Sequence, residues 1–372
     1  MNGGIAVTAL DLLALCTAIG ILGLRLWVFP QGRAGHGHAG DRQTQGFPLP
    51  LWRLLGLCLV LLTLTSVADL LRRAADMSGQ PLSELADFLP AVVSQTHFGR
   101  VWLLRPIALL LLWLGWRTGP RPSAAGSAAV MLAFACLVAA SRSLSGHAAD
   151  SGDFTLPELM DWLHLVAVSL WGGSLVALTV TGFASFRAAA QARRQEIADM
   201  ARRWSTLSAA ALGVVVVTGI YNTWLQVEHL SALWETAYGG VLLAKLALVA
   251  AVVLLGAANR YLGVPALQAW ASGYGSGKPP AGAVAAVLSV LTLERFRKPD
   301  GDGHGDAPLA AFIRRARIEG VLMIVTVLCA AVLLGQMPAR HAHPAPAAPA
   351  AQPSGHEHPA AHDHTHEDTG GQ

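Results

Sequence analysis

The sequence carries little charge. Only 13% of its 372 residues are Asp, Glu, Lys or Arg, whereas 53% are hydrophobic and the mean hydropathy is +0.47. A soluble domain usually contains about 25% charged residues. The composition therefore excludes a soluble protein and indicates an integral membrane protein.

The sequence is also poor in cysteine and methionine. Its four cysteines, Cys16, Cys58, Cys136 and Cys329, lie in separate apolar runs without a CxxC pair, which argues against a disulfide framework or a zinc site. The seven methionines form no cluster of the soft thioether kind that binds Cu(I). Motifs of nucleotide-binding loops, serine hydrolases and metalloproteases are missing. We therefore expect no enzymatic activity, no nucleotide cofactor and no nucleic-acid partner.

Long apolar runs are abundant. A helix needs about 20 mostly apolar residues to cross a bilayer, and eight stretches qualify. They are residues 5–29, 51–71, 101–117, 124–141, 159–183, 206–226, 240–259 and 318–336. We predict an all-α polytopic membrane bundle of eight transmembrane helices over residues 1–336, embedded in the lipid bilayer and without an evident internal repeat. The first helix is interpreted as retained rather than cleaved, and the shorter run 281–293 as an interfacial segment.

Basic residues are distributed unevenly between the connections. Five flank the connection after the fifth helix and eight flank the connection after the seventh. The positive-inside rule makes these odd-numbered connections cytoplasmic, so both termini face outward. The second connection, on the outer side, has apolar residues at helical spacing between residues 82 and 93, which predicts a short amphipathic helix on the outer surface.

Half of the histidines lie in a C-terminal tail. The last 32 residues contain seven of the 14, interspersed with acidic residues and prolines: His341, His343, His356, His358, His362, His364 and His366. Residues 337–372 have no apolar periodicity, so we expect a disordered tail. His-x-His units suit divalent ions such as Cu(II). The tail is therefore a candidate for metal capture, the alternative being a non-specific polar tail.

The helical body has its own candidate metal ligands on the outer side. His164 lies within the fifth span, three residues after Asp161, so we expect the two to share a helix face and the carboxylate to orient the ring. Ionisable groups inside a span are costly and usually functional. The alternative is a histidine satisfied by an interhelical hydrogen bond. His97 and His147, which flank neighbouring spans, complete the predicted ligand set.

Further polar residues lie at similar outer depth. Asp69 ends the second span, Arg105 and Lys245 lie within the third and seventh, and Trp171 follows His164 by seven residues. We predict that these residues line a polar cavity open to the outside. For Arg105 and Lys245 the alternative is salt bridging that holds the helices together.

Several short motifs resemble the copper resistance protein D family. Thr96–Arg105 resembles the entry to a transmembrane helix of this family, and Ser145–Ala148 with Asp161–Gly173 resemble its next signatures. The remaining motifs follow in the family's order: Arg203–Ser205, Thr218–Tyr221, Tyr238–Gly239, Leu243–Lys245, Asn259–Arg260 and Arg317–Glu319. The likeness extends over residues 5–336.

This resemblance implies a protein of the bacterial inner membrane with periplasmic termini, engaged in copper tolerance or uptake. Its cargo is copper, as Cu(II) or Cu(I), and a periplasmic copper-binding protein of the copper resistance C type is the implied partner. Our hypothesis is that the tail captures copper and passes it to His164, His97 and His147. Two other classes stay open: a haem-binding electron-transfer protein, which needs two facing histidines, and a copper sensor or assembly factor that does not transport.

Overall fold

A computed structural model of the chain describes residues 2–29, 47–120, 125–145, 154–190, 194–226, 231–273, 287–288 and 306–336. These residues form helices and no strand, which confirms the all-α class. Eight of the helical segments are long and apolar enough to span a membrane, as predicted. The C-terminal tail and all but residues 287–288 of the expected interfacial segment lie outside the described residues.

The first four spans come from the N-terminal half of the chain. They are α1 (Asn2–Gly23) with the π-helical turn η1 (Leu24–Val28), α2 (Leu49–Ser78), α4 (His97–Trp102) with α5 (Leu104–Arg117), and α6 (Ala125–Ser143). The predicted amphipathic segment is helical and packs on α2 through Leu85 and Val92. It consists of a 3-10 helix, η2 (Leu82–Asp87), followed by α3 (Leu89–Gln95), rather than one α-helix.

The last four spans form the C-terminal half. They are α7 (Leu156–Val168) with the π-helical turn η4 (Ser169–Gly173) and α8 (Ser174–Val180), α10 (Arg194–Gln226), α12 (Ala237–Ala258) with the π-helical turn η5 (Asn259–Gly263) and α13 (Val264–Ala271), and α15 (Ala307–Leu334). The short helices α9 (Ala184–Ala190) and α11 (Ala232–Glu235) lie in the connections.

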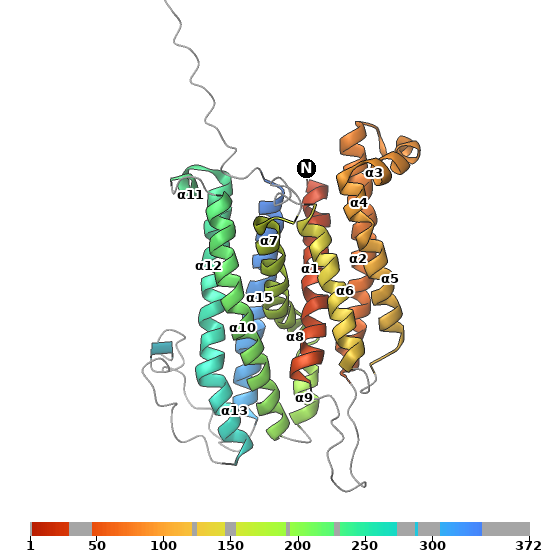
Figure 1. Cartoon of the computed structure of the whole chain (residues 1–372). Helices are drawn as coiled ribbons and strands as arrows, with labels where there is room; N and C mark the ends of the chain where they lie inside the picture. The colour runs from red at the N-terminus through yellow and green to blue at the C-terminus, as the bar shows by residue number, and fades with distance from the viewer. Residues whose placement is uncertain are drawn as a thin grey trace, which may run out of the picture.

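Helix α1 lies at the centre of the bundle. It packs against α2 and α6 of its own half and against α8 and α15 of the other half (Figure 1). Glycine allows this close approach: a Cβ on Gly20 would lie 2.2 Å from the backbone of Gly173, and one on Gly173 would lie 1.8 Å from the carbonyl oxygen of Cys16. The backbones of the two halves are therefore in contact. We call the end at which α1 begins, drawn at the top of Figure 1, the upper end.

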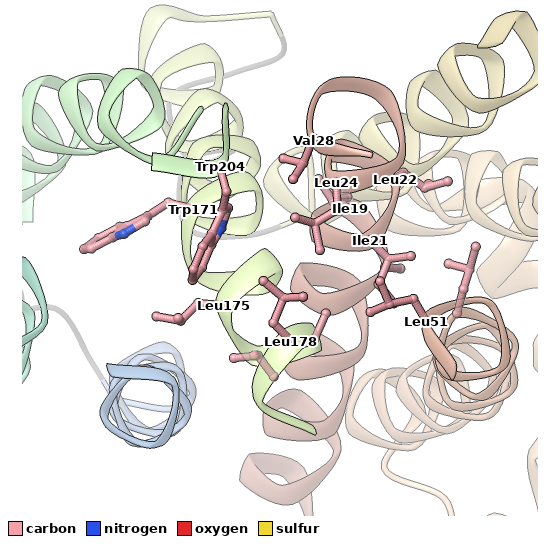
Figure 2. Packing of buried hydrophobic residues seen from close by; sticks show 14 of the residues in the cluster. Ile19, Ile21, Leu22, Leu24, Val28, Leu51, Trp171, Leu175, Leu178 and Trp204 are labelled. Carbon is pink, nitrogen blue, oxygen red and sulfur yellow. The ribbon is translucent and has the colours of Figure 1, made fainter. Parts of the chain in front are cut away.

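One large apolar cluster surrounds α1. Figure 2 shows Ile19 of α1 near Leu178 of α8, with Leu51 of α2 on the other side. Trp171 and Trp204 lie beside each other in the same cluster. Large apolar side chains also cover much of the outside of the described bundle. Such an outer surface suits lipid rather than water, in agreement with eight membrane spans.

Candidate functional site

His164 lies at the interface between α7 and α10. Its Nδ1 is 3.0 Å from Thr218 Oγ1, and the Thr218 hydroxyl donates to the carbonyl oxygen of Val214 at 2.7 Å. Because the single hydrogen of this hydroxyl is used on a backbone carbonyl, Nδ1 must donate to Thr218. The neutral ring then keeps a lone pair on Nε2. The ring also interacts with the backbone of Val215, and no other described residue forms a hydrogen bond with it.

Asp161 does not orient His164 as predicted. Its Oδ2 accepts a hydrogen bond from Ser143 Oγ of α6 at 2.5 Å, whereas His164 bonds to α10. Three residues turn an α-helix through about 300°, which leaves the two side chains about 60° apart. This angle is large enough for each side chain to meet a different neighbouring helix.

Lys245 of α12 lies near His164, and Cys329 of α15 lies near Lys245. The half-buried Lys245 interacts electrostatically with Asp161, His164 and Cys329, yet it forms no ion pair or hydrogen bond with any described residue. His164, Thr218 and Lys245 each lie eight residues, or about 12 Å, from the upper end of their helices. We call His164, Asp161, Thr218, Lys245 and Cys329 the C-half polar site.

A second group of polar residues lies at a similar depth in the first half. Asp11 of α1 is 3% exposed and forms ion pairs with Arg105 of α5 and Arg142 of α6, the latter at 2.8 Å. Thr65 of α2 donates to Asp11 at 2.7 Å, and Arg105 Nε donates to Ser66 of α2 at 2.7 Å. These five residues, the N-half ion cluster, join all four helices of the first half. Its central carboxylate, Asp11, was missed in the sequence, although it is the only acidic residue of its span.

The residues predicted to line one cavity lie in different places. Arg105 belongs to the N-half ion cluster and Lys245 to the C-half polar site. Asp69 forms ion pairs with Arg72 and Arg73 of its own helix, at 2.9 and 3.4 Å. Trp171 lies in the apolar cluster, because the π-helical turn η4 adds a residue to one turn and rotates the following chain away from the His164 stripe.

The described histidines do not form a joint ligand set. His97 begins α4 and is exposed on the α3–α4 side of the bundle, whereas α7 lies near the centre (Figure 1). His147 and the seven tail histidines lie outside the described residues. Within the described ranges, no three His, Cys, Asp or Glu side chains are grouped to hold a metal ion. Only His164, of the two predicted histidine ligands that can be placed, lies inside the bundle.

The third spans of the two halves begin alike. Thr96 caps α4 and Thr236 caps α12, and each hydroxyl accepts a hydrogen bond at 2.9 Å from the backbone N–H of the glycine three residues later. In both, the ninth residue after the threonine is basic and faces inward, Arg105 in one and Lys245 in the other. Both segments read Thr-x-aromatic-Gly-x-Val-x-Leu-x-basic, so the expectation of no evident internal repeat overlooked a short one.

The first and second helices of the two halves are also joined alike. Thr65 of α2 bonds to Asp11 of α1, and Thr218 of α10 bonds to His164 of α7. The N-half ion cluster and the C-half polar site are therefore corresponding positions in two similar four-helix halves. The N-half ion cluster consists of ion pairs, whereas the C-half polar site contains the imidazole of His164.

A third polar group lies lower in the bundle, between α12 and α15. Glu319 Oε1 accepts a hydrogen bond from Asn259 Nδ2 at 2.5 Å, and Asn259 Oδ1 accepts one from Arg315 Nε at 2.9 Å. All three side chains are buried. In the sequence, Asn259 and Glu319 were identified only as parts of family motifs and were not predicted to contact each other. Glu319 could have been recognised in the sequence as a carboxylate at the edge of an apolar run.

The architecture defines a polytopic helical membrane protein of two four-helix halves, each with a group of polar residues near the upper end. Two family models match the chain, one in its N-terminal part and one in its C-terminal part. A family model for the N-terminal domain of copper resistance protein D-like proteins matches residues 3–155, and one for copper resistance protein D matches residues 198–333. The chain belongs to the copper resistance protein D family, which confirms the resemblance seen in its motifs.

Two curated relatives carry names that refer to copper. Copper transport protein CutJ of Bacillus subtilis (strain 168) is 30% identical over 179 residues, which are 46% of this chain and 32% of the relative. Copper resistance protein D of Pseudomonas syringae pv. tomato is 29% identical over 245 residues, 62% of this chain and 74% of the relative. The chain thus spans less than two thirds of the Bacillus protein. No solved structure matches this chain.

Proposed function

We propose that this protein carries copper across the bacterial inner membrane, from the periplasm to the cytoplasm, and that His164 binds the ion on its way. Membership of the copper resistance protein D family and the names of the two relatives support a role in copper handling. The observation that carries the site is the imidazole itself. Thr218 holds its Nδ1–H, which leaves the Nε2 lone pair for a metal inside the bundle.

The surroundings of His164 suit copper. Imidazole nitrogen binds both Cu(II) and Cu(I), and the sulfur of Cys329 is a soft donor that favours Cu(I). Asp161 supplies negative charge near the ion, which reduces the cost of a cation in the membrane. Lys245 balances Asp161 when no ion is bound. The proposed site thus contains one nitrogen ligand, with a sulfur donor beside Lys245 and a pair of opposite charges nearby.

The proposed orientation rests on the distribution of basic residues. Arg194, Arg202 and Arg203 lie in the lower part of α10, and further arginines, such as Arg315 and Arg317, lie in the lower part of α15. Under the positive-inside rule the lower end faces the cytoplasm. Both termini then face the periplasm, where the tail histidines and a periplasmic copper-binding protein of the copper resistance C type deliver copper to the upper end.

The protein has no chemical reaction of its own in this proposal. A haem held between two histidines would need both rings to face each other in the bundle. Of the described histidines, His97 is exposed on α4 and His164 bonds to Thr218 of α10. This arrangement favours a transporter over a membrane cytochrome.

The test is copper flux into proteoliposomes that contain the full-length chain and a copper-sensitive dye. His164→Ala removes the proposed ligand, and we expect flux to fall roughly tenfold or more. His164→Asn keeps a donor for Thr218 but has no ring nitrogen, so it should lose flux equally while remaining folded. His97→Ala should raise the copper concentration needed for half-maximal flux without changing the maximal rate, because His97 is exposed at the start of α4 and serves at the entrance.

Wild-type flux in both histidine variants, at equal protein amounts, would refute the assignment of His164. Flux no greater than that of empty liposomes would refute transport itself. Replacing the seven tail histidines with alanine separates capture from passage. We expect this variant to lose binding of copper at low concentration and to keep flux at high concentration.

A further inference from the structure

Glu319 lies in the lower half of the bundle, away from the proposed copper ligand. Along α12, its partner Asn259 follows Lys245 by 14 residues, or about 21 Å of helix. Glu319 itself is 4% exposed. Its Oε2 packs against Gly256, where an added Cβ would lie 3.6 Å away. The carboxyl group is therefore enclosed between α12 and α15 and separate from the C-half polar site.

Glu319 is held by a neutral partner. Its only hydrogen bond to a described residue comes from the amide of Asn259, which in turn accepts from the guanidinium of Arg315. Arg315 interacts electrostatically with Glu319 but forms no direct ion pair with it. A buried carboxylate without a direct ion pair is costly, whereas a neutral carboxylic acid satisfies this geometry because its carbonyl oxygen accepts from Asn259 and its hydroxyl occupies the Oε2 position.

Other charged groups near this interface are engaged elsewhere. Arg260 donates to Ser205 of α10 at 3.0 Å, and Arg317 donates to the carbonyl oxygen of Gly182 at 3.2 Å. Helix α13 has no charged residue, and α8 contributes the uncharged Thr179 beside Gly320. The charged residues of α1 and η1 interact with other partners: Asp11 with Arg105 and Arg142, and Arg25 with the rings of Phe47 and Trp52. Arg315 is thus the described charge that acts on Glu319.

The position of Asn259 also marks this region as unusual. Asn259 is the first residue of the π-helical turn η5, and π-turns inside α-helices often occur at functional sites. At the end of the same turn, Gly263 makes room for Arg315, since an added Cβ would lie 2.9 Å from Nη2. The π-helical turn η5 therefore both positions Asn259 and leaves space for Arg315. Helix α6, the counterpart of α15 in the first half, carries no carboxylate.

We propose that Glu319 is a proton-exchange site of the transport cycle, which releases a proton to the cytoplasm when a copper ion enters the lower half of the bundle. The coupling step rests on the proposed copper transport. The O–H bond of the carboxylic acid breaks, water at the lower end accepts the proton, and the carboxylate remains bonded to Asn259. One positive charge leaves as a Cu(I) ion arrives, so the charge buried in the lower half does not change. The carboxylate takes up a proton again from water at the lower end after the ion has left, so a complete cycle releases no net proton.

Proton binding is tested first without copper. Infrared difference spectra of the full-length protein in liposomes, recorded between two pH values, should show the carbonyl stretch of a protonated carboxylic acid that disappears on ionisation. We expect Glu319→Gln to remove this band. Glu158→Gln is the matched control, because Glu158 is also a buried glutamate but only caps α7, and it should keep the band. A titrating band that persists in Glu319→Gln would overturn the proposal.

Coupling is tested with copper and a pH-sensitive dye in the same proteoliposomes. Wild-type protein should release a transient burst of protons to the cytoplasmic side when copper is added, and its rate of copper flux should depend on the pH of that side. Glu319→Gln should abolish the burst and the pH dependence and slow flux by roughly a hundredfold, while Glu319→Asp should retain a shifted pH profile. Unchanged flux and pH dependence in Glu319→Gln would overturn the coupling. If the wild type carries no copper, the proposed function fails, yet the infrared experiment still decides whether Glu319 binds a proton.

Discussion

The two halves of the bundle treat corresponding polar positions in opposite ways. In the first half, Asp11 is paired with Arg105 and Arg142. In the second half, Lys245 occupies the position of Arg105 but forms no ion pair with a described residue, and His164 keeps an unused lone pair. The same arrangement of helices therefore holds a satisfied ion cluster on one side and an unsatisfied site on the other.

This difference indicates what each position can do. An ion cluster that is fully paired and buried cannot admit another cation without losing an existing pair, which is costly in a membrane. The Lys245 ammonium forms no ion pair with a described residue and the His164 ring is neutral, so the C-half polar site can bind a ligand without losing an ion pair. We therefore assign stability to the N-half ion cluster and ligand binding to the C-half polar site.

The largest effect on stability should come from Asp11. Asp11→Asn leaves Arg105 and Arg142 buried without a carboxylate, and we expect a loss of about 3–5 kcal/mol in the free energy of unfolding. Unfolding in mixed detergent micelles measures it. Asp76→Asn is the control, because its pair with Arg72 is exposed, and it should cost at most about 1 kcal/mol. Equal losses in the two variants would show that the cluster does not stabilise the first half.

The contact between the halves should be the next most sensitive feature. Gly173→Ala places a methyl group against the Cys16 carbonyl oxygen, where backbone atoms cannot move aside. We expect a loss of about 1–3 kcal/mol or more. Gly213→Ala is the matched control on α10, since nothing lies within 4 Å of the added Cβ, and it should be neutral or slightly stabilising. A neutral Gly173→Ala would contradict the close approach of α1 and η4.

The eight spans could be predicted because crossing hydrocarbon imposes a direct requirement on sequence. Their lengths could not. The sixth span was expected at residues 206–226, whereas α10 begins at Arg194, because a helix continues beyond the bilayer wherever charged residues can reach water. Apolarity marks the part of a helix within lipid, and the rest depends on packing against neighbours.

The candidate site could be found only in part. His164 and Lys245 were recognisable as ionisable residues within spans. The partner of His164, Thr218, could not be inferred, since it depends on which helix faces α7. The π-helical turn that removes Trp171 from the His164 stripe also has no clear sequence signal. Asp11 could have been found, because a lone acid in an apolar span needs a buried partner.

The two corresponding threonines provide a direct comparison of the halves. Thr218→Val removes the acceptor that fixes the His164 tautomer, and loss of such a partner lowers metal affinity roughly 10–100-fold. Thr65→Val removes a bond to Asp11 and should reduce stability without changing copper affinity. Copper titration and detergent unfolding of both variants test this. Similar affinity losses in the two would contradict the assignment of binding to the second half alone.

The smallest effect on stability should come from replacing Lys245, the basic residue of the second half that corresponds to Arg105. Lys245→Met removes an ammonium that forms no ion pair with a described residue, so the free energy of unfolding should change by less than about 1 kcal/mol. Copper affinity should rise, because the ammonium repels a cation at His164. Arg105→Met, by contrast, should destabilise the protein by several times as much and leave copper affinity unchanged, since its guanidinium forms an ion pair with Asp11.

If Lys245→Met instead destabilises the protein as strongly as Arg105→Met and weakens copper binding, Lys245 holds the second half together as Arg105 does the first. The two halves would then be equivalent, and the copper site would have to lie elsewhere.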